Sequence, residues 1–276
     1  MKNFRFFLLT AILCLTAFGG AQAQDSIVRT NLSQAEIDRI VKTFTTKEGE
    51  SRAALSQYVF NRSASVSTIG LGGNITGAFR RDSFMNISPE GVRVEKILFA
   101  PVSTLTEVEM TVEDLEDLSG VNPFALDPSA VNLYNFTFVG KEKIDELDLY
   151  VFDVAPKVLP DPKKTKQRFF LGRIWVDDRD LQIVKSRGKG VPETKKNKFP
   201  VVETIRMNVD GKYWFPADTR SDDEIVFDSG QVVKLRVRIK YTNYRQGKSE
   251  VRILDDTETE VKEEPKPSPS PSPTPK

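Results

Sequence analysis

Three aspartates, Asp177, Asp178 and Asp180, are close enough in the sequence to suggest acid–base chemistry. Two neighbouring carboxyl groups can split their pKa values, so that one acts as an acid and the other as a base. These three residues, however, lie between two segments with strand-like alternation, where aspartate is favoured because it stabilises tight turns. We therefore predict a turn at this position and no catalytic pair.

Two other groups of residues have spacings that could bind a ligand. Gly70, Gly72, Gly73 and Gly77 resemble a phosphate-binding loop, but they separate two predicted strands, so we expect a hairpin turn. The acidic residues within 113–117 resemble a metal site. Most of them lie on the outer face of a short predicted helix near its N-terminus, where negative charge is favourable in any case. Neither group predicts a metal or phosphate site.

The composition argues against most catalytic classes. The chain has 276 residues and no histidine, and its single cysteine, Cys14, lies in the apolar leader described below. The mature chain therefore lacks disulfides, the usual zinc and copper ligands, and the commonest general base. It also has no Gly-x-Ser-x-Gly nucleophile motif. With a net charge of +1, nothing favours a nucleic-acid partner. We expect no enzyme, no cofactor and no metal.

The N-terminus has the pattern of a secretory signal peptide. Lys2 and Arg5 precede an apolar run at residues 6–18, and an Ala-x-Ala site ends at Ala23. The run is too short for a membrane span. We expect cleavage after Ala23 and a soluble exported product. Lipid attachment at Cys14 is the alternative, although the residue before it is not small.

The C-terminus differs in composition from the rest of the chain. Residues 263–276 alternate proline with serine, threonine and lysine, which is typical of an extended polyproline-like tail. The tail could be a solubilising spacer or a ligand for another envelope protein. We expect three parts: a signal peptide at 1–23, a single β-rich domain at 24–262, and the tail.

The clearest strand covers residues 232–245. Val233, Leu235, Val237, Ile239 and Tyr241 lie on one face, and the cations between them lie on the other. Such alternation indicates an antiparallel strand with one buried and one solvated face. Similar alternation recurs along the chain and predicts about ten antiparallel strands, a number at which a sheet tends to curl.

Two short helices are expected to cover part of the concave face. Ser33 and Glu36 form a capping box that begins the first helix, which we expect to end near Gly49. Thr111 begins the second helix, which ends near Gly120. The residues predicted to form the inner side of this lid are Ile37, Ile40, Val41, Phe44, Leu115 and Leu118.

The concave face itself is expected to be aromatic and aliphatic. With 18 phenylalanines against 2 tryptophans, the interior has large apolar surfaces and few polar groups, which suits an acyl chain. We predict that the acyl-chain cavity is lined by Phe60, Phe136, Phe138, Tyr150, Phe152, Phe170, Ile174, Val176, Val237 and Ile239. A fully packed core without a ligand is the alternative.

Four sequence segments carry a resemblance to a known family. They are Tyr-Asn-Phe-Thr-Phe-Val-Gly-Lys at 134–141, Tyr-Val-Phe-Asp-Val at 150–154, Phe-Leu-Gly-Arg-Ile-Trp-Val-Asp at 170–177 and Gly-Lys-Tyr-Trp-Phe-Pro at 211–216. In this order they resemble the LolA/LolB-like family of bacterial outer-membrane lipoprotein-sorting proteins, as a long and divergent member. The resemblance implies a mainly β fold, an unclosed antiparallel β-barrel with a helical lid over an apolar cavity.

The resemblance also implies a function. Members carry the acyl chains of lipoproteins across the periplasm, from an inner-membrane donor to an outer-membrane acceptor. We therefore expect a monomeric periplasmic carrier of a lipoprotein or lipid. The alternative is a non-enzymatic sensor or interaction module of the envelope on the same fold.

Overall fold

The computed structural model describes residues 27–87, 93–110, 114, 126–164, 168–195 and 197–247. These residues contain one long helix, α1 (Gln34–Leu55), a short 3-10 helix, η1 (Val131–Leu133), and ten strands. The strands are β1 (Tyr58–Ile69), β2 (Ile75–Ile87), β3 (Arg93–Phe99), β4 (Tyr134–Ile144), β5 (Leu147–Pro156), β6 (Phe169–Asp177), β7 (Ile183–Val191), β8 (Val202–Val209), β9 (Tyr213–Val226) and β10 (Val232–Gln246).

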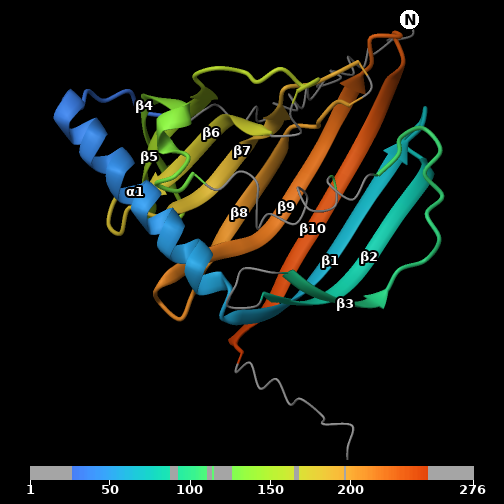
Figure 1. Ribbon diagram of the computed structural model, residues 1–276, viewed down its shortest axis with the longest axis horizontal. Helices are drawn as coiled ribbons and strands as arrows, with labels where there is room; N and C mark the ends of the chain where they lie inside the picture. The colour runs from blue at the N-terminus through green and yellow to red at the C-terminus, as the bar shows by residue number, and fades with distance from the viewer. Residues whose placement is uncertain are drawn as a thin grey trace, which may run out of the picture.

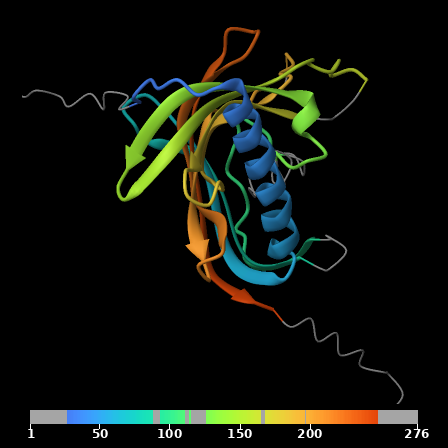
Figure 2. The same ribbon diagram turned by 90° about the vertical axis from the view of Figure 1, so that its left-hand side faces the viewer.

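All ten strands form one sheet in the order β3-β2-β1-β10-β9-β8-β7-β6-β5-β4. Neighbouring strands are antiparallel throughout, and the sheet curls with α1 across its concave side (Figures 1 and 2). Because β3 and β4 remain as two separate edges, the barrel is not closed. The predicted mainly β fold, an unclosed antiparallel barrel of about ten strands, is confirmed.

The first and last strands pair with each other in the middle of this sheet. The β1–β10 ladder runs from Tyr58 opposite Gln246 to Ile69 opposite Lys234. The chain therefore builds the β1–β3 part of the sheet first and then has to reach the opposite edge to begin β4. Between Phe99 and Tyr134 it makes this crossing, and the described part of the crossing borders the cavity considered below.

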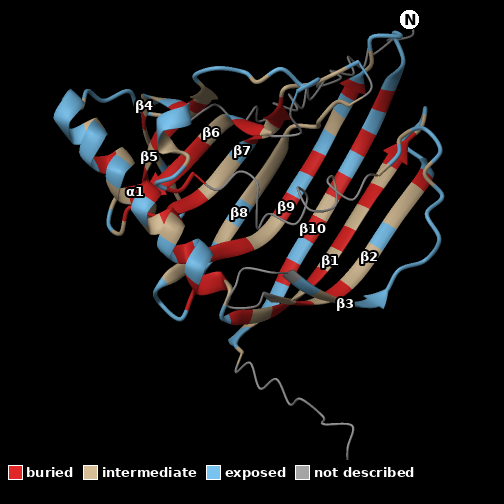
Figure 3. Ribbon diagram, in the orientation of Figure 1, coloured by how far each residue is buried: buried red, intermediate tan, exposed pale blue. Residues whose placement is uncertain are grey.

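The alternation predicted for β10 is present in the structure. Val233, Leu235, Val237, Ile239 and Tyr241 are buried, and exposed or half-buried cations lie between them (Figure 3). On the outer face, the carboxylate of Asp222 on β9 accepts hydrogen bonds from Arg236, at 2.8 Å, and Arg238. The basic side of this strand is thus a solvated surface with acidic partners on its neighbour.

The helix α1 begins at the predicted capping box. The Ser33 hydroxyl accepts from the Glu36 backbone N–H at 3.3 Å, and the Glu36 carboxylate accepts from the Ser33 backbone N–H at 3.0 Å. The predicted end near Gly49 is wrong, because the helix continues to Leu55. A Cβ at Gly49 would lie 3.2 Å from Cδ of Pro128. Glycine here allows the segment before β4 to approach the helix, so it is a close-packing position and not a helix end.

The outer face of the sheet is not solvated everywhere, which corrects the expectation of one dry and one wet side. Leu149, Val151, Trp175 and Val184 form a buried cluster on the outer side of β5, β6 and β7. Ile27 packs against this cluster, and Val28 pairs with Lys141 of β4 through backbone hydrogen bonds of 2.7 and 2.9 Å. The N-terminal segment therefore covers apolar surface that an isolated edge strand would expose.

This covering segment depends on a glycine. A Cβ at Gly140 would lie 2.5 Å from the Val28 carbonyl oxygen, and the φ angle of Gly140 is 154°. We predict that Gly140→Ala lowers the free energy of unfolding by about 1–3 kcal/mol, because the added atom displaces the pairing segment. Urea unfolding followed by tryptophan fluorescence measures this, since Trp175 and Trp214 both contact the outer cluster.

Gly73→Ala is the matched control. Gly73 has a φ of 85° and open space around its Cβ position, so its substitution reports only the backbone cost of a positive φ. Equal losses of stability in the two variants would contradict a specific role for the Val28 pairing.

Candidate ligand-binding cavity

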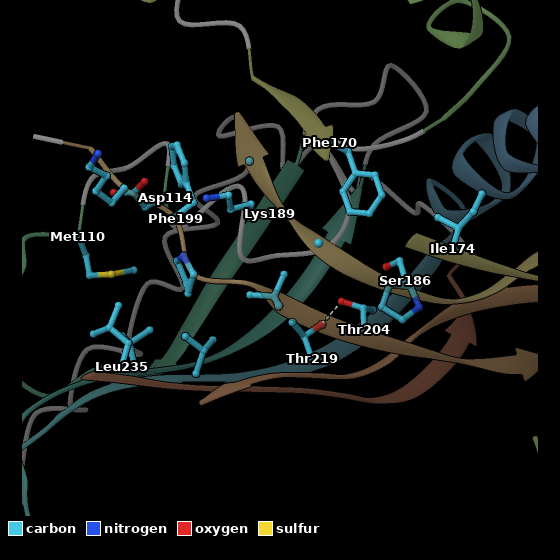
Figure 4. Close-up of a pocket in the computed structure, with 18 of the residues that line it drawn as sticks. Met110, Asp114, Phe170, Ile174, Ser186, Lys189, Phe199, Thr204, Thr219 and Leu235 are labelled. Atoms are coloured by element: carbon cyan, nitrogen blue, oxygen red, sulfur yellow. Dashed lines mark hydrogen bonds between the residues drawn. The ribbon is translucent and has the colours of Figure 1, made fainter. Parts of the chain in front are cut away.

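A cavity of about 530 Å³ lies on the concave side of the sheet (Figure 4). This volume is within the range of small-molecule sites, about 300–1,000 Å³. Its walls come from the last turns of α1, from β1 and β6–β10, and from the described part of the crossing between β3 and β4. Residues 107–110 and 114 border it on one side, and residues 197–200 border it on another.

The cavity separates two hydrophobic cores. The first core, around β1, β9 and β10, contributes Leu55, Val66, Phe215, Ile225, Leu235 and Val237 to the wall. The second core, around β5, β6 and the first half of α1, contributes Leu126, Phe170, Ile174 and Ile183. Between them, β8 presents Val202, Thr204 and Arg206 to the cavity. The two cores do not merge because the strand that joins them carries polar side chains on its inner face.

The aromatic ring of Phe170 lies against two glycines at one side of the cavity. Gly172 and Gly188 are opposite each other on β6 and β7, and a Cβ at Gly188 would lie 2.4 Å from Cε2 of Phe170. The backbone N–H of Phe170 donates to the Tyr134 hydroxyl at 3.1 Å, and burial raises the pKa of Tyr134. The missing side chains therefore let this ring lie flat on the sheet and shape the cavity wall.

The second half of α1 is fastened to the sheet by polar contacts that border the cavity. Both guanidinium NH2 groups of Arg206 donate to the Glu48 carboxylate, at 2.6 and 2.7 Å, and only 16% and 8% of the two side chains are exposed. Burial works to lower the pKa of Arg206, but the charge and hydrogen bonds of Glu48 outweigh it and raise the pKa. One turn further on, Ser51 donates to Gln182 at 3.2 Å.

Other charged groups that line the cavity are also paired. Arg168 lies 3.2 Å from Asp114, with its guanidinium 4.5 Å from the ring centre of Phe199. Lys189 and Lys198 lie 3.1 Å and 2.9 Å from the carboxylates of Glu193 and Asp228. These three cations are therefore matched by acidic partners.

The predicted inner-face residues are distributed between this cavity and the two cores. Phe170, Ile174 and Val237 line the cavity. Phe60 and Ile239 are buried in the first core. The residues that belong to the second core or pack against it are Phe136, Phe138, Tyr150, Phe152 and Val176. These two groups fill the ends of the concave face with the protein's own side chains, and the space remains between them.

The predicted lid residues have a similar distribution. Ile37, Ile40, Val41 and Phe44 pack on the second core, where the Phe44 ring is edge-on to Phe136 with centroids 5.5 Å apart. The half of α1 that borders the cavity is the following one, with Glu48, Ser51, Arg52 and Leu55. Leu115 and Leu118 lie outside the described residues.

Sequence reasoning missed the polar residues of the cavity. Thr204, Arg206 and Glu48 belong to no motif in the sequence, and the apolar residues of β8, Ile205 and Met207, do not identify its inner face. The structure leaves Ile205 and Met207 partly exposed on the outer side, at 38% and 43%. No local signal identifies the inner face of β8. Arg206 lies inside because it pairs with Glu48, and this pairing is known only from the tertiary structure.

The aspartates at the β6–β7 connection form a turn, as predicted. The Asp177 carboxylate accepts from the Arg179 backbone N–H at 3.2 Å, and burial raises its pKa. The Asp180 carboxylate accepts from the Gln182 backbone N–H and from the Trp214 indole, both at 2.9 Å. Within the described ranges, no three acidic residues, histidines or cysteines are grouped as metal ligands.

The fold of this chain is similar to several solved protein structures. The sequence matches no family model and no curated protein sequence. A DUF1329 family protein from Desulfovibrio piger is similar over 76% of this chain and 96% of its own, with 15% sequence identity and a TM-score of 0.36. A LolA superfamily protein from Nitrosomonas europaea is similar over 74% and 94%, with 12% identity and a TM-score of 0.32.

A third structure, a domain from Vibrio parahaemolyticus named after outer-membrane lipoprotein sorting, is similar over 73% of this chain and 92% of its own. Its sequence identity is 12% and its TM-score 0.35. At these values the likeness concerns the fold alone. In the part of the chain that the structure describes, no helix is both long and apolar enough to cross a membrane.

Proposed function

We propose that this protein is a non-enzymatic periplasmic carrier that shields the acyl chain of a lipoprotein or lipid in the cavity under α1. The observation that carries the proposal is an apolar-walled space of about 530 Å³ between two packed cores. The protein's own aromatic side chains fill both ends of the concave face but leave this middle part open. Since apolar surface buried from water contributes about 25 cal/mol per Å², such a wall favours an apolar occupant.

The leader and the family resemblance support the location and the partners. We propose cleavage after Ala23, residence of the β-rich domain in the periplasm as a monomer, and passage of cargo from an inner-membrane donor to an outer-membrane acceptor. The Pro-rich tail, residues 263–276, is proposed to remain outside the packed domain. The leader and the tail lie outside the described residues.

The carrier proposal predicts a stepwise dependence of affinity on chain length. Each methylene group transferred into the cavity contributes about 0.8 kcal/mol, so each added carbon should tighten binding about 4-fold until the cavity is full. Beyond that length the affinity should stop rising. Competition of saturated fatty alcohols of increasing length against a fluorescent acyl probe measures this series.

Two outcomes would contradict the proposal. An affinity that does not rise with chain length would show that the cavity does not hold the chain. Native mass spectrometry of the gently purified protein should also find acyl-bearing adducts, and a cavity that stays empty in the presence of excess lipid would exclude the carrier function.

A further inference from the structure

Three hydroxyl groups form a row across the cavity wall. Ser186 on β7 is directly opposite Thr204 on β8, and Thr204 is directly opposite Thr219 on β9. The hydroxyl oxygens of Thr204 and Thr219 are 2.8 Å apart, and Figure 4 shows Ser186 beside this pair. All three residues line the cavity. We call Ser186, Thr204 and Thr219 the hydroxyl row.

The hydroxyl row is flanked by apolar residues on the neighbouring strands. Ile174 of β6 is opposite Ser186, and Ile239 of β10 is opposite Thr219. Both isoleucines are almost fully buried, at 1% and 0% exposure. Valine or isoleucine at the three positions would continue this wall and would pack well in a strand. The hydroxyls are therefore not required by the sheet.

Hydrogen-bonding capacity remains after the contacts inside the row are counted. Each hydroxyl has one donor hydrogen and two acceptor sites, and the Thr204–Thr219 bond uses only one of the pair's two hydrogens. Within the described ranges, no hydrogen bond joins the Ser186 side chain to another protein group. Polar groups that lose water without a new partner cost free energy. A ligand that fills this cavity must therefore bring its own oxygen or nitrogen to the row.

The charges around the row indicate what kind of polar group fits. The nearest cation on β8 is Arg206, whose charge is already balanced by Glu48 at 2.6 Å. The lysine that lines the cavity from β7, Lys189, is 3.1 Å from Glu193. Among the described residues that line the cavity, a free carboxylate would find no unbalanced positive charge. A neutral carbonyl, which accepts hydrogen bonds without carrying a charge, suits the row.

We propose that the hydroxyl row binds the carbonyl oxygen of an ester or amide linkage, so that the ligand is an acylated molecule held at its linkage and not a hydrocarbon or a free fatty acid. This inference rests on the carrier function proposed above and adds the chemical class of the ligand. The row then fixes how deep the acyl chain enters, since the chain beyond the carbonyl extends along the apolar wall.

The test compares two ligands that differ only in the linkage. Palmitoyl lysophosphatidylcholine has an ester, and its hexadecyl ether analogue lacks the carbonyl. Binding of each, below its micelle concentration, is measured by displacement of a fluorescent acyl probe from the full-length mature protein. We expect the wild type to prefer the ester by about 2- to 10-fold, the effect of one neutral hydrogen bond.

The variants identify the source of that preference. The double variant Thr204→Val with Thr219→Val removes both partners of one bond without changing their shape, and Ser186→Ala removes the third hydroxyl. We expect each to lower the ester-to-ether ratio towards one while binding of the ether is unchanged. Thr242→Val, on the exposed outer face of β10, is the matched control and should keep the wild-type ratio.

The outcomes separate the two proposals. Equal binding of ester and ether by the wild type, or a preference that persists in both row variants, overturns the role of the hydroxyl row and leaves the carrier function standing. Failure of the wild type to bind either ligand overturns the carrier function itself. Urea unfolding of each variant confirms that a lost ratio is not a lost fold.

Discussion

Replacing Val202 with tryptophan is expected to weaken acyl-chain binding strongly without unfolding the protein. Val202 is the first residue of β8, faces the cavity and is only partly buried, so a larger side chain has space there. An indole in this position would take the place of several methylene groups of the ligand. If three are displaced, the loss is about 2.4 kcal/mol, or roughly 60-fold in affinity. Displacement of a fluorescent acyl probe measures it.

The stability of this variant should move in the opposite direction. Filling a cavity commonly raises the free energy of unfolding by about 0.5–2 kcal/mol. Ile205→Trp is the matched control because Ile205 belongs to the same strand but is exposed on the outer face. That control should bind like the wild type. Unchanged affinity in Val202→Trp would show that the acyl chain occupies some other surface.

Replacing Glu48 with glutamine is expected to have the largest effect on stability. The substitution keeps the shape of the side chain but leaves the buried Arg206 guanidinium without its counter-charge. Removal of one partner of a buried ion pair costs about 3–5 kcal/mol, and the remaining exposure of Arg206 favours the lower end of that range. Urea or thermal unfolding followed by circular dichroism measures the loss.

Glu50→Gln on the same helix is the control for this substitution. Glu50 pairs with Lys47 at 2.9 Å, but both side chains are largely solvated, so its loss should cost less than about 1 kcal/mol. The double variant Glu48→Met with Arg206→Met should recover most of the stability, because no charge remains buried. If Glu48→Gln were no more destabilising than Glu50→Gln, the buried pair would not be what holds the second half of α1.

These two predictions concern neighbouring parts of the structure, the cavity and the ion pair that holds the second half of α1 beside it. The first half of α1 is held by aromatic packing, as with Phe44 against Phe136, and the second half is held by the Glu48–Arg206 pair. The cavity lies beside the second half, where polar contacts bridge the helix and sheet and apolar filling is incomplete. An ion pair can span such a space because it needs contact only at the tips of two long side chains.

Local patterns in the sequence determined the strands and the turns, whereas the open-barrel class was implied by the resemblance of four strand segments to a known family. The alternation of β10 predicted which of its side chains are buried. In the β8–β9 turn, Asp210 and Gly211 have positive φ angles of 55° and 67°, the conformation that an Asp-Gly pair favours in a hairpin. The capping box of Ser33 and Glu36 predicted the start of α1. These features depend on residues that are neighbours in the chain or two positions apart, so the sequence contains their physical cause directly.

Only the tertiary structure decided where the cavity lies and what lines it. Gly49 was wrongly predicted as a helix end. Its actual role, a close approach to Pro128, involves a residue far along the chain, so no local pattern indicates it. The outer cluster around Trp175 and the inward polar face of β8 depend on which distant segment covers each side of the sheet. Burial is a property of the assembled strands and helix. A charged residue such as Arg206 can lie on the inner face only because the carboxylate of Glu48 on α1 neutralises its charge there.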